Sequence, residues 1–336
     1  MIDFSQNFNA LGVPRGLNDF VSQNVDSLFS YPQLQNTEVN FSIASLINCK
    51  TESVKYVNGS TEAFYSLPKI LNKPKTLIVQ PTFWEYEVAN RKNGIATKTF
   101  ALKESENFSL NVEMLEKQLE KDSVVYLCNP NNPTSTLTNK ATLIEIISKH
   151  KEVLFVVDET YLLFGHDYSR LTLTKKAQNL SNLYIVSSLS KFFSLPGIRA
   201  GFLVSTPKNI LLFSKCQTPY ASSSLSEEVA KWAVGQTKFI AETRNYYLKA
   251  RKIFYKDLAK SLKGRLLPFK PDANFILAKI LANYTSTQVA EKLKKKGLLV
   301  RDGIELSGLE NVWLRFAIKK PDENRRLISE LKTVLK

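Results

Sequence analysis

The sequence predicts an α/β fold, in which a large domain with a mostly parallel sheet flanked by helices is joined to a smaller α+β domain. Strand-like and helix-like runs alternate through residues 36–220, which is the pattern of βαβ units. Short strand-like runs return after residue 265 and are followed by a helix-like run. The 336 residues are enough to bury one large core and one smaller core.

The order of these runs predicts three segments. Residues 1–35 contain no long periodic run and are interpreted as an N-terminal arm that belongs with the small domain. Residues 36–235 are predicted to form the large domain, and residues 236–336 the C-terminal small domain. Within these segments we expect one helix or a helix pair over residues 222–262, strands at 275–277, 298–300 and 312–316, and a final helix from Pro321.

The composition is that of an ordinary globular chain and narrows the classes of function. Hydrophobic residues make up 43% of the chain and charged residues 23%. No apolar run reaches the length of a membrane span, and the N-terminus lacks the basic and apolar regions of a signal peptide. Cys49, Cys128 and Cys216 show neither pairing nor metal-ligand spacing, which predicts reduced thiols and a cytoplasmic protein. With only two histidines, neither a histidine metal site nor a Ser-His-Asp triad is expected.

The formal net charge of +15 allows three explanations. It can reflect a lysine-rich composition without functional meaning, steering of anionic substrates toward a basic cleft, or binding of nucleic acid. The lysines are spread through the chain and no helix-turn-helix or RNA-binding signature is present. We therefore predict no nucleic-acid partner and no membrane partner.

One lysine lies among hydroxyl side chains directly after a strand-like run at residues 183–186. Ser188 and Ser190 precede Lys191, and Arg199 follows eight residues later. An isolated lysine is usually a solvated surface charge, but open α/β sheets bind ligands at strand ends. A lysine amine can form a Schiff base with an aldehyde, and hydroxyls with a guanidinium can bind a phosphate. Pyridoxal phosphate carries both groups, so the segment predicts a site for this cofactor.

A carboxylate follows the preceding strand-like run, at residues 154–157. Asp158 can pair with the pyridine nitrogen of the cofactor and keep it protonated, which makes the ring an electron sink. Tyr161, three residues later, can reach the phenolic oxygen of the ring. The alternative for Asp158 is an ordinary helix N-cap.

A turn rich in small and hydroxyl residues opens a helix-like run near the start of the large domain. Gly59, Ser60 and Thr61 can offer backbone N–H groups and the positive end of a helix dipole to a phosphate. The alternative is that Ser60 or Thr61 simply caps the helix.

These motifs, read together, resemble the class I/II pyridoxal-phosphate-dependent aminotransferases of fold type I. The pattern Ser-x-Ser-Lys-x-x-x-x-x-Gly-x-Arg-x-Gly begins at Ser188, and the Asn-Pro loop spans residues 129–133. The resemblance implies that Asn132 binds the ring oxygen and that Phe83 stacks on the ring. The alternative for Asn132 is that it belongs to a plain connecting loop. The alternative for Phe83 is that its ring packs in the hydrophobic core. Ser135 stands where the family usually has glycine.

The resemblance also suggests how substrate and subunits meet. It implies that Arg315 and Arg301, on strands of the small domain, bind the carboxylate or phosphate of the substrate. It further implies that Tyr31 reaches the cofactor phosphate of a partner subunit, and therefore that the chain forms a homodimer. The alternative for Arg315 and Arg301 is that they are surface arginines without a ligand. The alternative for Tyr31 is that its ring anchors the arm.

Two branches of the family fit best, the histidinol-phosphate aminotransferases and the threonine-phosphate decarboxylases. The decarboxylase branch has an N-terminal pattern that residues 3–12 resemble, although Ala10 stands where that branch has proline. The resemblance implies a small phosphorylated amino acid or amine as substrate, processed through an external aldimine and a quinonoid intermediate. We expect the aminotransferase, with the decarboxylase of cobalamin biosynthesis as alternative. A broad amino-acid transaminase or a cofactor-sensing regulator fits less well.

Overall fold

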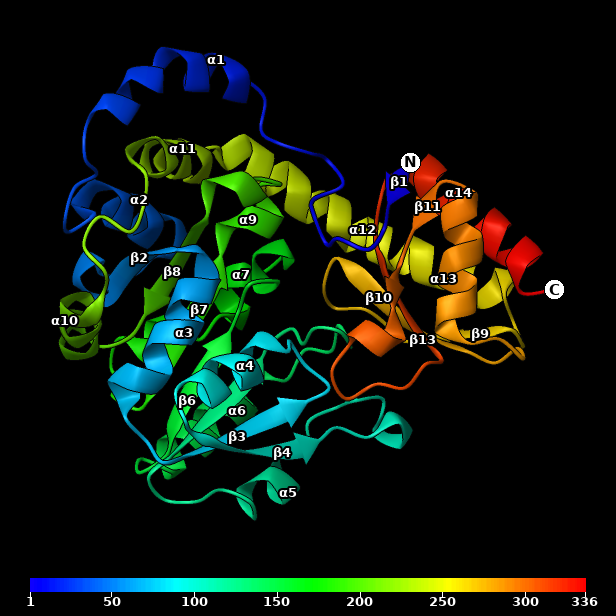
Figure 1. Cartoon of the computed structure of the whole chain (residues 1–336), viewed down its shortest axis with the longest axis horizontal. Coiled ribbons are helices and arrows are strands. Elements are labelled where there is room, and N and C mark those ends of the chain that lie inside the picture. Colours follow the sequence, from blue (N-terminus) through cyan, green and yellow to red (C-terminus); the bar gives the residue numbers. More distant parts are fainter.

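The large domain is built on a seven-stranded sheet in the order β2-β8-β7-β6-β5-β3-β4 (Figure 1). The structure is a computed structural model that describes all 336 residues. Every strand of this sheet runs parallel to the others except β8, which is antiparallel to both of its neighbours. The strands are β2 (Val54–Asn58), β3 (Lys75–Gln80), β4 (Ala96–Ala101), β5 (Ser123–Cys128), β6 (Leu154–Asp158), β7 (Leu183–Ser188) and β8 (Ala200–Val204). The predicted α/β fold with a mostly parallel sheet is confirmed.

Helices cover both faces of this sheet, which explains why its strands are continuous apolar runs. In β5, Val124 and Tyr126 belong to one hydrophobic cluster, whereas Val125 and Leu127 belong to the other. Successive side chains of a strand point to opposite faces, so both faces are buried. The helices of this domain are α2 (Thr37–Ile47), α3 (Gly59–Leu71), α4 (Glu85–Lys92), α5 (Val112–Glu116), α6 (Lys140–Lys149), α7 (Tyr168–Leu171), α8 (Thr174–Ala177), α9 (Leu189–Phe192), α10 (Pro207–Cys216) and α11 (Ser224–Val234).

The small domain packs its helices on a four-stranded antiparallel sheet in the order β12-β13-β10-β9. The predicted final helix from Pro321 is present. The elements are α12 (Thr237–Ser261), β9 (Leu266–Pro268), β10 (Phe275–Ile280), α13 (Ser286–Lys295), β11 (Leu298–Leu299), β12 (Arg301–Asp302), β13 (Trp313–Ala317) and α14 (Pro321–Val334). The long helix α12 runs from the large domain to the small domain in Figure 1. No helix combines the length and the apolar character needed to cross a membrane.

The first 35 residues connect both domains. Strand β1 (Ile2–Asp3) pairs in parallel with β11 of the small domain. Further along, α1 (Leu17–Gln23) and a 3-10 helix (Val25–Phe29) lie on α11, where the Phe20 and Trp232 rings stack with centroids 5.3 Å apart. The sequence predicts no long element here, and these two short helices form because α11 offers them an apolar surface. Residues 222–262 form a helix pair, broken between Val234 and Thr237.

Five further short 3-10 helices complete the connections: Thr51–Ser53, Glu104–Glu106, Leu162–Phe164, Pro196–Ile198 and Gly303–Glu305. The part of the large domain that bears on function is the carboxyl edge of the sheet. Strands β3, β5, β6 and β7 are parallel, so their carboxyl ends lie along one edge. The segments that follow them carry the residues predicted to form the site. In open α/β sheets this edge is where ligands bind.

Gly201 allows β8 to lie directly against the start of α3. A Cβ at this position would lie 2.6 Å from the Ser60 nitrogen and 2.9 Å from the Gly59 carbonyl carbon, both of which are backbone atoms. We expect Gly201→Ala to lower the free energy of unfolding by roughly 1–3 kcal/mol, as overpacking does. Denaturant unfolding measures this, with Gly197→Ala as control because nothing lies within 4 Å of its added Cβ. Equal stability of the two variants would contradict the close approach.

Candidate active site

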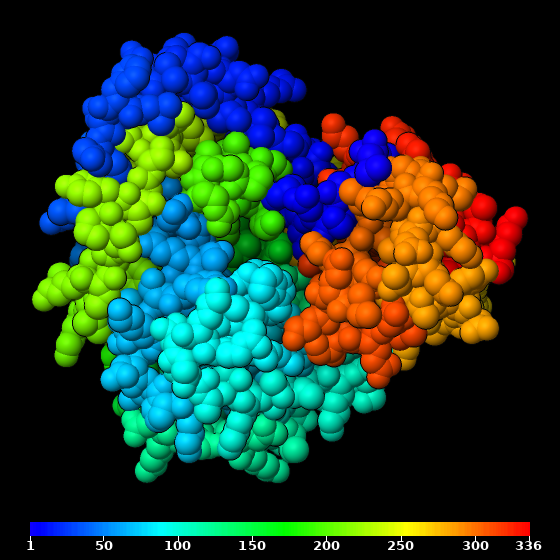
Figure 2. All heavy atoms as spheres, in the orientation of Figure 1, coloured from blue at the N-terminus to red at the C-terminus, as the bar shows by residue number.

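The residues predicted to form the site meet in a cavity of about 360 Å³. Figure 2 shows a hollow between the large domain and the small domain, bordered by the N-terminal segment. Twelve of the predicted residues line the cavity: Ser60, Thr61, Phe83, Asn132, Asp158, Tyr161, Ser188, Ser190, Lys191, Arg199, Arg301 and Arg315. The volume is within the range of small-molecule sites.

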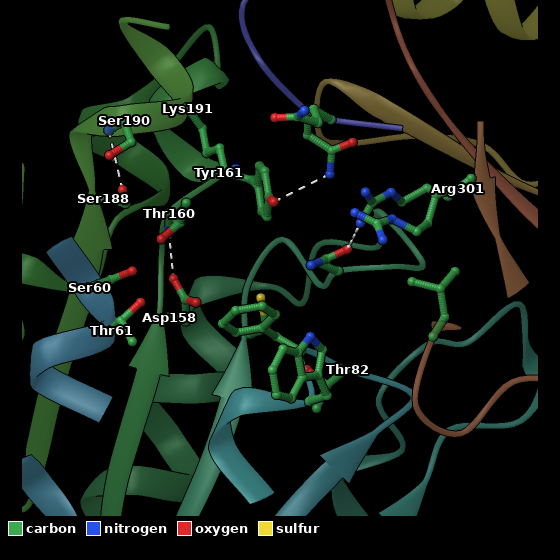
Figure 3. Close-up of a pocket in the computed structure, with 18 of the residues that line it drawn as sticks. Ser60, Thr61, Thr82, Asp158, Thr160, Tyr161, Ser188, Ser190, Lys191 and Arg301 are labelled. Atoms are coloured by element: carbon green, nitrogen blue, oxygen red, sulfur yellow. Dashed lines mark hydrogen bonds between the residues drawn. The ribbon is translucent and has the colours of Figure 1, made fainter. Parts of the chain in front are cut away.

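Lys191 reaches the cavity from α9, which begins where β7 ends. Ser188 caps this short helix, and its hydroxyl accepts a hydrogen bond from the Ser190 amide at 3.2 Å. The Lys191 side chain extends from the helix toward the centre of the site (Figure 3), and its Nζ lies 4.5 Å from the centre of the Phe8 ring. Burial, reinforced by the positive charge of Arg315, lowers the pKa of Lys191 to about 8. A substantial fraction of the amine is therefore neutral near pH 8.

The N-terminus of α3 offers an anion site. Gly59 has a φ of 73°, and a Cβ at this position would lie 2.6 Å from the Nη2 atom of Arg199. Ser60 and Thr61 line the cavity beside this guanidinium, and the Ser190 hydroxyl is buried without a hydrogen-bond partner. Free N–H groups at a helix start, a guanidinium and an unpartnered hydroxyl are the groups that bind a phosphate. The residues present thus fit the phosphate of pyridoxal phosphate.

Asp158 closes β6 with a carboxylate that is only 5% exposed. Its Oδ1 accepts a hydrogen bond from the Thr160 amide at 2.8 Å, and its Oδ2 accepts one from the Tyr86 hydroxyl at 2.6 Å. Burial raises the pKa of Asp158, and both hydrogen bonds act against this rise. A carboxylate held in this way can keep a ring nitrogen protonated.

Tyr161 lies beyond the end of β6 and faces the same cavity (Figure 3). Its hydroxyl accepts a hydrogen bond from the side-chain amide of Asn7 at 3.3 Å, and its ring packs edge-on against Phe275. Burial raises the pKa of Tyr161 to about 12, so the hydroxyl keeps its proton and can donate it to a ring oxygen.

Arg315 joins the small domain to the Asn-Pro loop of the large domain. Its Nη1 donates to the Asn132 side-chain oxygen at 2.6 Å, and its Nη2 donates to the Ser5 carbonyl at 2.7 Å. The Nε atom is buried and has no partner, and burial lowers the pKa of Arg315 to about 10. The Asn132 oxygen is occupied by this contact, which leaves the amide group of Asn132 as the donor for a ligand.

Arg301 marks the rim of the cavity on the small-domain side. Its Nη1 lies 2.5 Å from the Glu305 carboxylate, and both side chains line the cavity. The following loop rests on the large domain, since a Cβ at Gly308 would lie 3.1 Å from the Cα of Pro81. Arg301 is therefore available to an anion only in competition with Glu305.

Two predicted residues lie outside the cavity lining. Gly59 has no side chain, which leaves room for the Arg199 guanidinium that lines the cavity. Tyr31 is 83% exposed, and its ring contacts Tyr220 with centroids 5.0 Å apart. The structure therefore does not bring Tyr31 to the cavity of its own chain.

Two parts of the site are not predicted by the sequence, namely the N-terminal segment and Tyr86. Ser5, Gln6 and Asn7 line the cavity, because the pairing of β1 with β11 draws this segment over it. The only sequence signal was the resemblance of residues 3–12 to one branch of the family. Tyr86 follows Phe83 by three residues, and the turn that enters α4 brings their rings to a centroid distance of 5.6 Å.

Comparison with known proteins identifies the family. The model of the family described as "Aminotransferase class I and II" matches residues 1–331. The chain belongs to this family. It is an enzyme that depends on pyridoxal phosphate, and its fold is that of the fold type I enzymes.

The similar proteins carry two different activities in their names. A provisionally named threonine-phosphate decarboxylase of Caldanaerobacter subterraneus subsp. tengcongensis is 30% identical over 97% of this chain and 88% of its own length. A histidinol-phosphate aminotransferase of Methanococcus maripaludis is 27% identical over 100% of this chain and 90% of its own length. The crystal structure of the histidinol-phosphate aminotransferase from Clostridium acetobutylicum has a TM-score of 0.91 and 28% identity, and 99% of each chain is covered. The expected branch is thus confirmed.

The lowered pKa of Lys191 predicts how the apo-protein captures its cofactor. Only a neutral amine attacks an aldehyde, so the reactive fraction of Lys191 falls about tenfold for each pH unit below its pKa of about 8. Stopped-flow absorbance of apo-protein mixed with pyridoxal phosphate, at several pH values, measures the capture rate. The rate should rise with pH and level off above about 8. A midpoint near the ordinary lysine pKa of about 10.4 would contradict the burial effect.

Proposed function

We propose that this enzyme is an aminotransferase that resembles the histidinol-phosphate aminotransferases and acts on a small phosphorylated amino acid or amine. The observation that carries the proposal is the position of Arg315 and Arg301 in the same cavity as Lys191. Two guanidiniums opposite the lysine suit a substrate with an anionic group beside its amine. The phosphate site at α3 is then left to the cofactor.

Each residue has a defined task in this proposal. When bound, pyridoxal phosphate supplies an aldehyde that condenses with the substrate amine and a ring that withdraws electrons from the substrate Cα. Asp158 holds the proton on the ring nitrogen, and Tyr161 donates to the ring oxygen. Lys191, with a pKa of about 8, removes and returns the proton at Cα as general base. Arg315 orients the substrate by its anionic group.

The distribution of charge supports an anionic substrate. Residues 236–336 contain 23 Lys and Arg but only 10 Asp and Glu, so they hold most of the +15 net charge of the chain. This segment includes β12 and β13, whose arginines line the cavity. A cationic domain beside the cleft attracts anions and speeds their association.

A threonine O-phosphate decarboxylase is the second candidate, because the Ser5–Asn7 segment lines the cavity. The sequence around this segment resembles the decarboxylase branch, and its Ser5 carbonyl fixes Arg315. The angle at which Arg315 presents the substrate decides which Cα bond stands perpendicular to the ring. Only that bond overlaps the π-system, so a change of angle exchanges loss of a proton for loss of carbon dioxide.

A single-turnover experiment distinguishes the two activities. The holoenzyme is mixed with histidinol phosphate or with threonine O-phosphate, while the cofactor absorbance is followed and carbon dioxide is trapped. Conversion of the cofactor to its amine form without gas supports the aminotransferase. Gas release with the cofactor regenerated supports the decarboxylase. Equal turnover of unphosphorylated amino acids would contradict both and indicate a broad transaminase.

We further propose that two copies of the chain associate through the surface around Tyr31. Phe29 is 86% exposed, and Leu34 and Phe41 are 59% and 63% exposed on neighbouring segments. A second copy would cover this apolar surface and place Tyr31 near the cofactor phosphate of its partner.

This proposal predicts a particle of twice 38.1 kDa in light scattering. Tyr31→Phe should weaken the binding of pyridoxal phosphate severalfold, because one hydrogen bond to the phosphate is lost, while the dimer persists. A monomeric particle, or unchanged cofactor affinity in the variant, would contradict the proposed role of Tyr31.

We place the enzyme in the cytoplasm as part of the same proposal. The support is chemical: Cys49, Cys128 and Cys216 are all free thiols. Fractionation of the producing cells tests it, and recovery outside the cytoplasmic fraction would contradict it.

A further inference from the structure

The Tyr86 hydroxyl makes a direct contact with the carboxylate that faces the ring nitrogen. It donates to Oδ2 of Asp158 at 2.6 Å, while the Thr160 amide donates to Oδ1. The carboxylate thus has one partner for each oxygen. The Thr160 partner is a backbone group within the same turn, whereas Tyr86 comes from a different element, α4, and is separated from Asp158 by 72 residues.

The surroundings of Tyr86 fix the position of this hydroxyl. The residue is fully buried, and its ring packs edge-on against Phe64 at 4.8 Å and against Phe83 at 5.6 Å. It also stacks on Tyr126 at 5.6 Å. The side chain has no room to turn, so the hydroxyl stays aimed at Asp158.

Tyr86 also keeps its proton. Burial and the charge of Asp158 raise the pKa of Tyr86 well above its ordinary value. The hydroxyl therefore remains protonated and a donor near neutral pH. A donor to the charged form of a buried carboxyl favours that charged form.

Phe83 lies in the turn that leads into α4, where its carbonyl accepts a hydrogen bond from the Tyr86 amide at 3.4 Å. It lines the cavity and is predicted to stack on the cofactor ring. The turn that enters α4 therefore bears both on the face of the ring, through Phe83, and on its nitrogen, through Tyr86 and Asp158. A shift of this turn would disturb both contacts together.

We propose that Tyr86 is a positioning residue, whose hydroxyl holds Asp158 in the orientation and the ionised state needed to keep the ring nitrogen of bound pyridoxal phosphate protonated. The inference rests on the role assigned to Asp158, but it does not depend on which substrate the enzyme uses. Without the hydroxyl, Oδ2 of Asp158 is buried with no partner. The carboxyl then takes up a proton more readily and holds the ring nitrogen less well.

The test compares Tyr86→Phe with Tyr126→Phe. The two tyrosines stack on each other and are both buried, but the Tyr126 hydroxyl has no hydrogen-bond partner. Each holoenzyme is examined by the pH dependence of its cofactor absorbance, the dissociation constant of pyridoxal phosphate, and the denaturant midpoint. We expect Tyr86→Phe to displace the absorbance transition and to weaken cofactor binding by roughly tenfold or more, the loss typical of a hydrogen bond to a charged group. Tyr126→Phe should change neither the absorbance transition nor the dissociation constant of pyridoxal phosphate.

A double-mutant cycle shows whether Tyr86 acts through Asp158. In the Asp158→Asn background, Tyr86→Phe should have little further effect on cofactor affinity or on the spectrum. Where a phosphorylated substrate is turned over, kcat should fall in Tyr86→Phe with KM nearly unchanged. Fully additive effects, or an unchanged spectrum in Tyr86→Phe, would overturn the proposal. The spectrum and affinity need no substrate, so they remain decisive even if the proposed activity is wrong.

Discussion

Turnover is expected to fall by at least about 10⁴-fold when Lys191 is replaced by alanine. Lys191 is the only lysine that lines the cavity, and it is proposed to supply both the covalent anchor for the cofactor and the base for the proton at Cα. General-base catalysis alone is worth about 10²–10⁴-fold, and loss of the covalent step adds to it. The variant is assayed with the substrate identified in the single-turnover experiment.

The Lys191→Ala protein should nevertheless fold and bind pyridoxal phosphate without a covalent bond. Burial of the amine lowers its pKa, so a charged Lys191 costs stability at neutral pH and its removal should not lower the denaturant midpoint. A control, Lys238→Ala, removes an exposed lysine of α12 and should be fully active. Near-normal activity of Lys191→Ala would refute the proposed mechanism.

Arg315→Gln should raise the KM for the phosphorylated substrate by roughly 10²–10³-fold. Truncating one partner of a buried ion pair costs about 3–5 kcal/mol, and in the complex the pair is Arg315 with the anionic group of the substrate. In the protein itself, the hydrogen bonds of Arg315 go to the neutral oxygens of Asn132 and Ser5. The substitution therefore removes a buried charge without a counter-ion, so the midpoint of unfolding should hold or rise.

Arg301→Gln is the matched comparison for that experiment. Arg301 is half-buried and already paired with Glu305, so its loss should raise KM by no more than about tenfold, as for partly exposed ion pairs. Initial-rate kinetics over a range of substrate concentrations give the KM of both variants. If the two variants behaved alike, Arg315 would not be the principal anion ligand.

Most of the cavity could be predicted because its residues lie in short local patterns. Asp158 ends a buried apolar strand, and Lys191 and Asn132 follow two others. Parallel strands bring their carboxyl ends to one edge of the sheet. Gly59 indicates a turn, because glycine adopts the positive φ found at this position more easily than other residues do. In each case the sequence signal and the site lie within a few residues of each other. The proposed chemical roles of these residues stay predictions until the variants are measured.

The structure of the N-terminal arm could not be predicted from local sequence patterns. Residues 17–29 have no strong period of their own, and their two short helices are stabilised by the apolar face of α11, far along the chain. The role of Ser5 was equally hidden, because it depends on a backbone carbonyl, which every residue type has. A pattern of side chains carries no information about such a contact.

The sequence by itself determined the fold class, the cofactor and the residues at the strand ends, because local patterns of burial and turn chemistry specify them. The tertiary structure alone decided how these residues are held. Tyr86 meets Asp158 across 72 residues, and Arg315 meets Asn132 across 183 and Ser5 across 310. Buried donors and acceptors must find partners, but which partners they find depends on how the sheets and helices pack. Those pairings fix the positions of the Asp158 carboxylate and the Arg315 guanidinium.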